Sequence, residues 1–156
     1  MENLNRIIFA NGKGGLPKIK IHTEWSDAEI YLLGAHVTKF QRKGEPPLLF
    51  LSEKSQFETG HPIRGGVPII FPWFGASEGK SAAHGFARNQ TWELKEISQN
   101  DSGLVVHLVL PESAESASYP KFSAEYFVTV GETLALELRI TNQSNKIFTF
   151  ENCLHT

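Results

Sequence analysis

The sequence predicts an all-β fold, an antiparallel β-sandwich, from three observations. Short segments with alternating polar and apolar side chains recur along the chain, clusters of turn residues separate them, and no segment has a convincing helical pattern. Many short strands joined by turns are typical of a sandwich or barrel rather than of a parallel sheet with crossover helices. We expect a single domain over residues 1–156, because no repeat or interdomain linker interrupts the pattern.

Four strands are expected in the early part of the chain. Residues 18–22 alternate polar and apolar side chains, and residues 28–33 and 37–40 are rich in strand-forming types. Residues 48–51 read Leu-Leu-Phe-Leu, and such a continuous apolar run predicts a buried strand. The cluster Gly44-Glu45-Pro46-Pro47 is expected to form the turn between the last two strands.

Two hairpins are expected in the later part of the chain. Residues 91–97 alternate again, and the turn Asn100-Asp101-Ser102-Gly103 leads into a strand over residues 104–110. Strands over residues 122–130 and 134–141 flank a second turn, Gly131-Glu132-Thr133. The last of these strands is expected to place four apolar side chains on one face: Leu134, Leu136, Leu138 and Ile140.

Two segments do not follow this succession of short strands and turns. Residues 111–118 are short and polar, and we expect a loop there with about one helical turn. Residues 60–90 contain six glycines, three prolines, two histidines and two arginines, without a clean period. Long irregular segments inside compact domains are usually functional, so this segment is expected to contain the functional site.

Composition excludes several classes of function. Lys and Arg number 15 against 17 Asp and Glu, a net charge of −2, which disfavours nucleic-acid binding through a basic face. The one cysteine, Cys153, rules out an intrachain disulfide and fits a cytoplasmic protein. The apolar runs are too short for a secretory signal or for the roughly 20 residues that span a bilayer, so we expect no membrane partner.

Basic residues in the irregular segment are candidates for ligand binding. Arg64 precedes Gly65-Gly66, and Arg88 supplies a second guanidinium that can bind a phosphate or carboxylate through two hydrogen bonds. His84 lies among small residues, from which it can reach a ligand hydroxyl. Ordinary surface ion pairs for the arginines, and a structural role for the histidine, remain open.

His155 is a candidate on the basis of strand periodicity. If residues 148–155 form a strand, Glu151, Cys153 and His155 share a polar face that is either solvated or the wall of a site. The six histidines lack the short paired spacings of zinc ligands, so we expect no metal. There is no nucleophile elbow and no phosphate-binding or dinucleotide-binding glycine motif, so no cofactor is expected.

Ordered motifs along most of the chain resemble the D-hexose-6-phosphate mutarotases, or glucose-6-phosphate 1-epimerases, of the aldose 1-epimerase superfamily. The motifs are Arg64-Gly65-Gly66-Val67-Pro68, Phe71-Pro72-Trp73-Phe74-Gly75, His84-Gly85-Phe86-Ala87-Arg88-Asn89 and Phe150-Glu151-Asn152-Cys153-Leu154-His155-Thr156. The resemblance implies a galactose mutarotase-like sandwich and the interconversion of the α and β anomers of a hexose 6-phosphate. It implies general acid and base catalysis without a metal or redox cofactor.

The resemblance also implies a role for each candidate residue. His155 matches the histidine that acts as general acid at the ring oxygen, and His84 matches a histidine that holds the sugar. Arg64 and Arg88 match arginines that contact the substrate. The base of the family is a glutamate in the C-terminal part of the sandwich, beyond the position of His155, and Glu151 does not match it.

We therefore expect this chain to be the N-terminal portion of a longer mutarotase-like domain. Without the base, the chain alone is expected to be inactive or nearly so, and exposed sandwich edges would favour self-association. Two other functions remain open. One is a sandwich that binds a sugar phosphate without turning it over, and the other is an epimerase of unphosphorylated aldoses.

Overall fold

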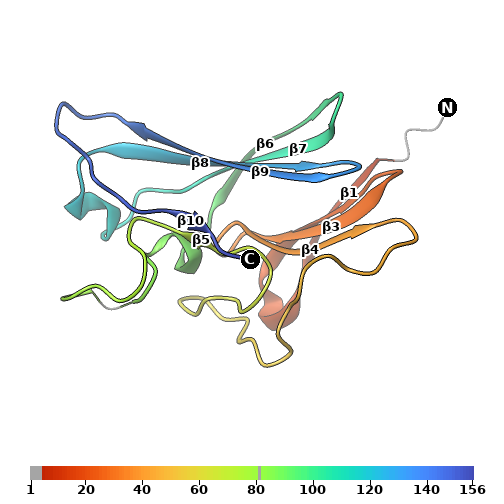
Figure 1. Ribbon diagram of the computed structural model, residues 1–156, viewed down its shortest axis with the longest axis horizontal. Coiled ribbons are helices and arrows are strands. Elements are labelled where there is room, and N and C mark those ends of the chain that lie inside the picture. Colours follow the sequence, from red (N-terminus) through yellow and green to blue (C-terminus); the bar gives the residue numbers. More distant parts are fainter. Residues whose placement is uncertain (1–4, 81) are drawn as a thin grey trace.

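The computed structural model describes residues 5–80 and 82–156. Its described strands form two four-stranded antiparallel sheets and a two-stranded ribbon, and the two larger sheets lie one above the other (Figure 1). The helical elements among these residues are three short 3-10 turns: η1 (Lys13–Gly15), η2 (Ala87–Asn89) and η3 (Ser116–Ser118). The all-β sandwich predicted from the sequence is confirmed.

The first sheet is a meander of four consecutive strands in the order β1-β2-β3-β4. Its strands are β1 (Arg6–Asn11), β2 (Pro17–His22), β3 (Ser26–Tyr31) and β4 (His36–Arg42). In β2 the side chains of Ile19 and Ile21 are buried, whereas those of Lys18 and Lys20 face outward, as the alternation predicts.

The second sheet is also a meander, in the order β6-β7-β8-β9. It contains β6 (Glu93–Asn100), β7 (Gly103–Val109), β8 (Phe122–Val130) and β9 (Leu134–Asn142). Both predicted hairpins are confirmed, because β6 pairs with β7 and β8 pairs with β9 in antiparallel register. The predicted apolar face of β9 is confirmed by four half-buried residues that pack against the core: Leu134, Leu136, Leu138 and Ile140.

The hydrophobic core lies between the two sheets. Inward-facing side chains of β2, β3 and β4 form one continuous cluster with those of β7 and β8. Within this core the buried Ser26 hydroxyl on β3 donates a hydrogen bond to the Gly131 carbonyl at the β8–β9 turn, over 2.6 Å. This bond joins the two sheets across 105 residues of sequence.

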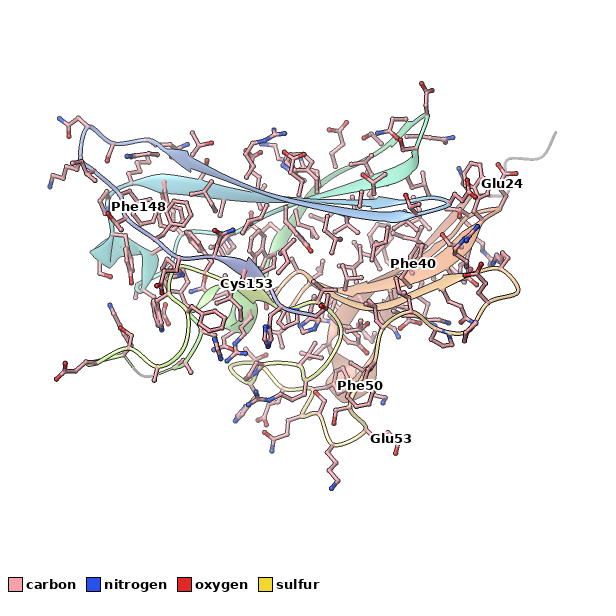
Figure 2. All side chains as sticks on the ribbon, viewed as in Figure 1. Glu24, Phe40, Phe50, Glu53, Phe148 and Cys153 are labelled. Carbon is pink, nitrogen blue, oxygen red and sulfur yellow. The ribbon has the colours of Figure 1, made fainter. Side chains whose placement is uncertain are left out.

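One predicted strand is wrong. Residues 48–51 contribute only an isolated bridge between Leu51 and Gly65, and Leu48 and Phe50 are 67% and 77% exposed. Figure 2 places Phe50 on the loop that follows β4, apart from the two large sheets. An apolar run is not enough to make a buried strand here, because this loop lies outside the space between the sheets.

Both ends of the chain differ from the strands predicted there. The first strand, β1, was not expected from its short apolar run Ile7-Ile8-Phe9-Ala10, yet it pairs with β2 along its whole length. At the other end of the chain, regular strand structure is confined to β10 (Cys153–Leu154), which pairs with β5 (Ile69–Ile70). The single helical turn expected within residues 111–118 is confirmed as η3.

In the part of the chain that the structure describes, no helix reaches the length and apolar character needed to cross a membrane.

Replacing Ser26 by Ala tests the bond between the sheets. Loss of the hydroxyl leaves the Gly131 carbonyl without this donor, so we expect the free energy of unfolding to fall by about 1–3 kcal/mol. Urea denaturation measures the change. Ser98→Ala, at an exposed position of β6, is the matched control and should change the stability little. An equal effect of the two substitutions would contradict the role assigned to Ser26.

Candidate active site

A pocket of about 310 Å³ lies beside the β5–β10 ribbon and contains all four residues singled out from the sequence. Arg64, His84, Arg88 and His155 line it from four different segments of the chain. The remaining lining residues are Phe50, Ser52, Ile63, Gly65, Pro68 and Thr156. The structure therefore brings together side chains that are up to 91 positions apart, the separation of Arg64 from His155.

Arg64 reaches the pocket from an extended segment that pairs with the loop after β4. The Arg64 carbonyl accepts a hydrogen bond from the Ser52 N–H over 3.0 Å, and the Arg64 N–H donates to the Ser55 hydroxyl over 2.9 Å. These bonds hold the backbone of Arg64, while its side chain is exposed. No described carboxylate forms an ion pair with its guanidinium.

Arg88 lies on the turn η2 and is only 8% exposed. One terminal nitrogen of its guanidinium donates to the Ala83 carbonyl over 2.9 Å, but its buried Nε has no hydrogen-bond partner among the described residues. The turn itself is held by Trp92, whose indole N–H donates to the Ala87 carbonyl over 2.9 Å. A buried guanidinium without a carboxylate is unusual, because burial of an unpaired charge is costly.

His84 is held in one orientation by two hydrogen bonds to the same residue. Its backbone N–H donates to the Gly75 carbonyl over 2.8 Å, and its ring Nδ1 accepts from the Gly75 N–H over 3.0 Å. Because Nδ1 accepts, the proton of the neutral ring must be on Nε2. His84 also has a positive φ of 65°, an uncommon backbone conformation for a residue other than glycine.

His155 is placed by the β5–β10 ribbon. Cys153 and Leu154 pair with Ile70 and Ile69, and the His155 N–H then donates to the Pro68 carbonyl over 3.1 Å. As a result the rings of His155 and His84 are nearly parallel, with centroids 6.1 Å apart and an interplanar angle of 22°.

The Phe74 ring contacts both imidazoles edge-on. Its centroid lies 4.9 Å from that of His84 and 6.3 Å from that of His155. Glu151 fixes this part of the loop, because its carboxylate accepts from the Phe74 N–H over 2.8 Å. The Glu151 carboxylate thus stabilises the loop, and it does not line the pocket.

The pocket is positively charged. Burial, and next the positive charge of Arg64, lower the pKa of Arg88 below its ordinary value. Partial burial, followed by the charges of Arg88, His155 and Arg64, lowers the pKa of His84. None of the described lining residues is an aspartate or glutamate. The site is therefore suited to an anionic ligand.

Sequence reasoning did not identify several of the lining residues. Phe50 and Ser52 reach the pocket because their segment pairs with residues 64–66, a contact between loops that no local pattern reveals. Ile63 and Pro68 line it as neighbours of the Arg64 segment. Among the described residues, no group of three His, Cys, Asp or Glu is arranged to hold a metal ion.

Comparisons with known proteins agree on one family. The family model described as aldose 1-epimerase matches residues 17–156. A protein of Salmonella typhimurium is 34% identical over 141 residues, which cover 88% of this chain and 48% of that protein. A protein of Escherichia coli is 36% identical over 132 residues, covering 83% and 44% of the two chains. Both carry the name "putative glucose-6-phosphate 1-epimerase", and the chain spans slightly less than half of their length.

Solved structures give the same result. A crystal structure of a "putative mutarotase" from Salmonella typhimurium is similar with a TM-score of 0.74 and 37% identity, over 80% of this chain and 43% of that one. A galactose mutarotase-like protein of Clostridium acetobutylicum has a TM-score of 0.70 at 16% identity, over 90% and 50% of the chains. At that identity the likeness supports the fold.

The environment of His84 predicts that its imidazole stays neutral below the ordinary pKa of about 6.5. Protonation would add a charge beside Arg88, Arg64 and His155, and it would remove the Nδ1 lone pair that accepts from Gly75. NMR titration of the ring signals should place the midpoint below 6.5. Arg64→Ala should move the midpoint upward, and a wild-type midpoint at or above 6.5 would contradict this account.

The lowered pKa of His84 also makes the stability of the fold depend on pH. Because the folded-state pKa of His84 is below that of the unfolded chain, the unfolded chain binds more protons as the pH falls below about 6.5. The contribution of His84 to stability is therefore present at neutral pH and is lost on acidification.

Proposed function

Because the chain belongs to the aldose 1-epimerase family, we propose that it holds the substrate in an enzyme that interconverts the α and β anomers of a hexose 6-phosphate. The observation that carries the proposal is the convergence of two guanidiniums, Arg64 and Arg88, beside two nearly parallel imidazoles, with no ion pair from either guanidinium to a described carboxylate. The names of the bacterial relatives support the same substrate class.

The arginines bind the phosphate group in this proposal. Arg88 is buried and the charge of Arg64 disfavours its charged form, so a dianion between the two would offset both burial and repulsion. A phosphate carries this charge and presents several oxygens to planar guanidinium groups. A neutral sugar would leave the positive charges of both arginines without a counter-charge.

The imidazoles act on the sugar ring. His84 donates its Nε2 proton to a sugar hydroxyl and holds the ring, because its Nδ1 is occupied by Gly75. His155 is the general acid, and it protonates the ring oxygen as the bond between that oxygen and C1 breaks. A base removes the proton of the C1 hydroxyl, so that C1 becomes an aldehyde carbon. Rotation about the bond between C1 and C2, followed by reversal of these steps, gives the other anomer.

The base lies outside the described lining of the pocket in this proposal. No described carboxylate lines the pocket, and Glu151 accepts a hydrogen bond from the Phe74 N–H instead. We assign the base to a glutamate of the longer sandwich, as the family resemblance implies. These 156 residues alone should then bind the sugar phosphate without accelerating its anomerisation.

Because no described lining residue is acidic, a second candidate function is a sandwich that binds a sugar phosphate without turnover. An epimerase of unphosphorylated aldoses is the other alternative. Substitutions of Arg64 and His155 separate these functions from the proposed one.

Substitution of Arg64 tests the phosphorylated substrate. Arg64→Ala removes a charged hydrogen-bond donor from an exposed position, so the affinity for glucose 6-phosphate should fall about 10- to 100-fold while that for glucose is unchanged. Isothermal titration at fixed ionic strength measures both affinities. Arg42→Ala, which removes an exposed arginine paired with Glu45 and Glu132, is the control. An equal loss for glucose would favour the unphosphorylated-aldose function.

Substitution of His155 tests catalysis. In a chain that spans the length of the bacterial relatives, His155→Asn should slow anomer exchange of glucose 6-phosphate about 10²- to 10⁴-fold and leave binding nearly unchanged. Exchange NMR measures the rate, and the 156-residue chain should show only the uncatalysed background. A binding protein would have no turnover to lose. A rate well above background for the 156-residue chain would overturn the assignment of the base.

A further inference from the structure

His36 is a buried histidine that the proposed reaction does not use. It is the first residue of β4, and its side chain is 0% exposed. Its ring Nε2 lies 2.6 Å from the carbonyl oxygen of Gly65, the residue that follows Arg64. Sequence reasoning gave His36 no role in the site, because it stands among strand residues well before the irregular segment.

The peptide group between Gly65 and Gly66 is held from both sides. Its carbonyl faces His36, and its N–H donates to the Phe50 carbonyl over 2.6 Å. On the β4 side, the following residue Val67 donates its N–H to the Val37 carbonyl over 2.9 Å. The segment that carries Arg64 is thus enclosed between β4 and the loop after it.

Because glycines flank this peptide group on both sides, its direction depends on its hydrogen-bond partners. Gly65 has a φ of 96° and Gly66 a φ of 63°, a left-handed conformation that glycine adopts without cost. A side chain at Gly66 would collide with Val37 and the His36 ring. Two consecutive glycines can rotate the peptide plane between them easily, so the hydrogen bonds of its carbonyl and N–H determine its direction.

The hydrogen bond defines the state of the His36 ring. A carbonyl oxygen only accepts, so Nε2 must carry the proton. Nδ1 is buried and has no partner among the described residues, so it is the unprotonated nitrogen of a neutral ring. Burial, together with the charge of Arg88 and against the effect of the Gly65 hydrogen bond, lowers the pKa of His36 to about 4. The ring is therefore a neutral donor at physiological pH.

We propose that His36 is a positioning residue for the anion-binding arginines: its Nε2–H fixes the Gly65–Gly66 peptide plane and thereby holds Arg64 opposite Arg88. The benefit of this hydrogen bond to ligand binding rests on the proposed function, whereas the hydrogen bond itself does not. Without the donor, the Gly65 carbonyl loses its partner and the peptide plane is held only through the Gly66 N–H, so the approach of Arg64 to the pocket is less firmly fixed.

The experiment compares two substitutions of His36. His36→Gln retains an N–H donor that can reach the Gly65 carbonyl, whereas His36→Phe keeps a ring without a donor. The affinity for glucose 6-phosphate should fall at least about tenfold in His36→Phe and remain within about threefold of wild type in His36→Gln. Thr38→Val is the matched control, because it removes another buried polar group from β4. It should bind as wild type does.

A second measurement does not depend on ligand. Nitrogen-15 NMR of the imidazole reports which ring nitrogen of His36 is protonated, and the amide shift of Gly66 reports the peptide plane. We expect a proton on Nε2, a bare Nδ1, and a Gly66 amide that shifts in His36→Phe but little in His36→Gln.

Three results would overturn the proposal: a proton on Nδ1, wild-type affinity in a folded His36→Phe, or equal losses in the Phe and Gln variants. If wild type does not bind glucose 6-phosphate, the proposed function fails, and the ring and Gly66 signals still decide the role of His36. If His36→Phe does not fold, the hydrogen bond is tested by the protonated nitrogen of the wild-type His36 ring and by the Gly66 amide of His36→Gln, and a proton on Nδ1 or a large Gly66 shift in that variant would overturn the proposal.

Discussion

The site depends on the pairing of β5 with β10. Each strand contributes two residues, yet their antiparallel register places His155 next to Pro68 and beside His84. Aromatic packing supports this short ribbon, since Phe71 after β5 lies edge-on against Phe148 and Phe150 before β10. Figure 1 shows the ribbon between the second sheet and the loops, with the end of the chain at its edge. A contact of very small extent therefore brings His155 into a pocket formed by residues far earlier in the chain.

Most of the sandwich could be predicted because its strands have one buried and one exposed face. Along β8 and β9 more buried and more exposed side chains alternate almost without interruption, and the turn between the two strands contains Gly131. Residues 48–51 could not be assigned in this way. Their apolar character indicates burial, but Phe50 lies in a loop whose position depends on pairing with Gly65 and Gly66. Contacts of that kind join loops that have no periodic pattern.

The candidate site was predicted from motifs, and its supporting contacts were not. Arg64, His84, Arg88 and His155 match family motifs, and the structure places them around one pocket. The bond from His36 to Gly65 has no such signal, because a histidine at the start of a strand can be exposed, structural or functional. Which of these applies is determined by long-range packing. The contact between the buried His36 ring and the Gly65 carbonyl is thus one that only the fold reveals.

The charge of Arg88, which forms no ion pair with a described carboxylate, affects which ligands the pocket must distinguish. A buried guanidinium beside Arg64 attracts any small dianion, so inorganic phosphate would compete for the same position. Charge alone cannot favour a sugar phosphate over this competitor. Under the proposed function, selectivity must come from the uncharged donors and walls that would contact the sugar, such as the Nε2–H of His84. Under this proposal the arginines supply attraction, and the neutral part of the pocket supplies discrimination.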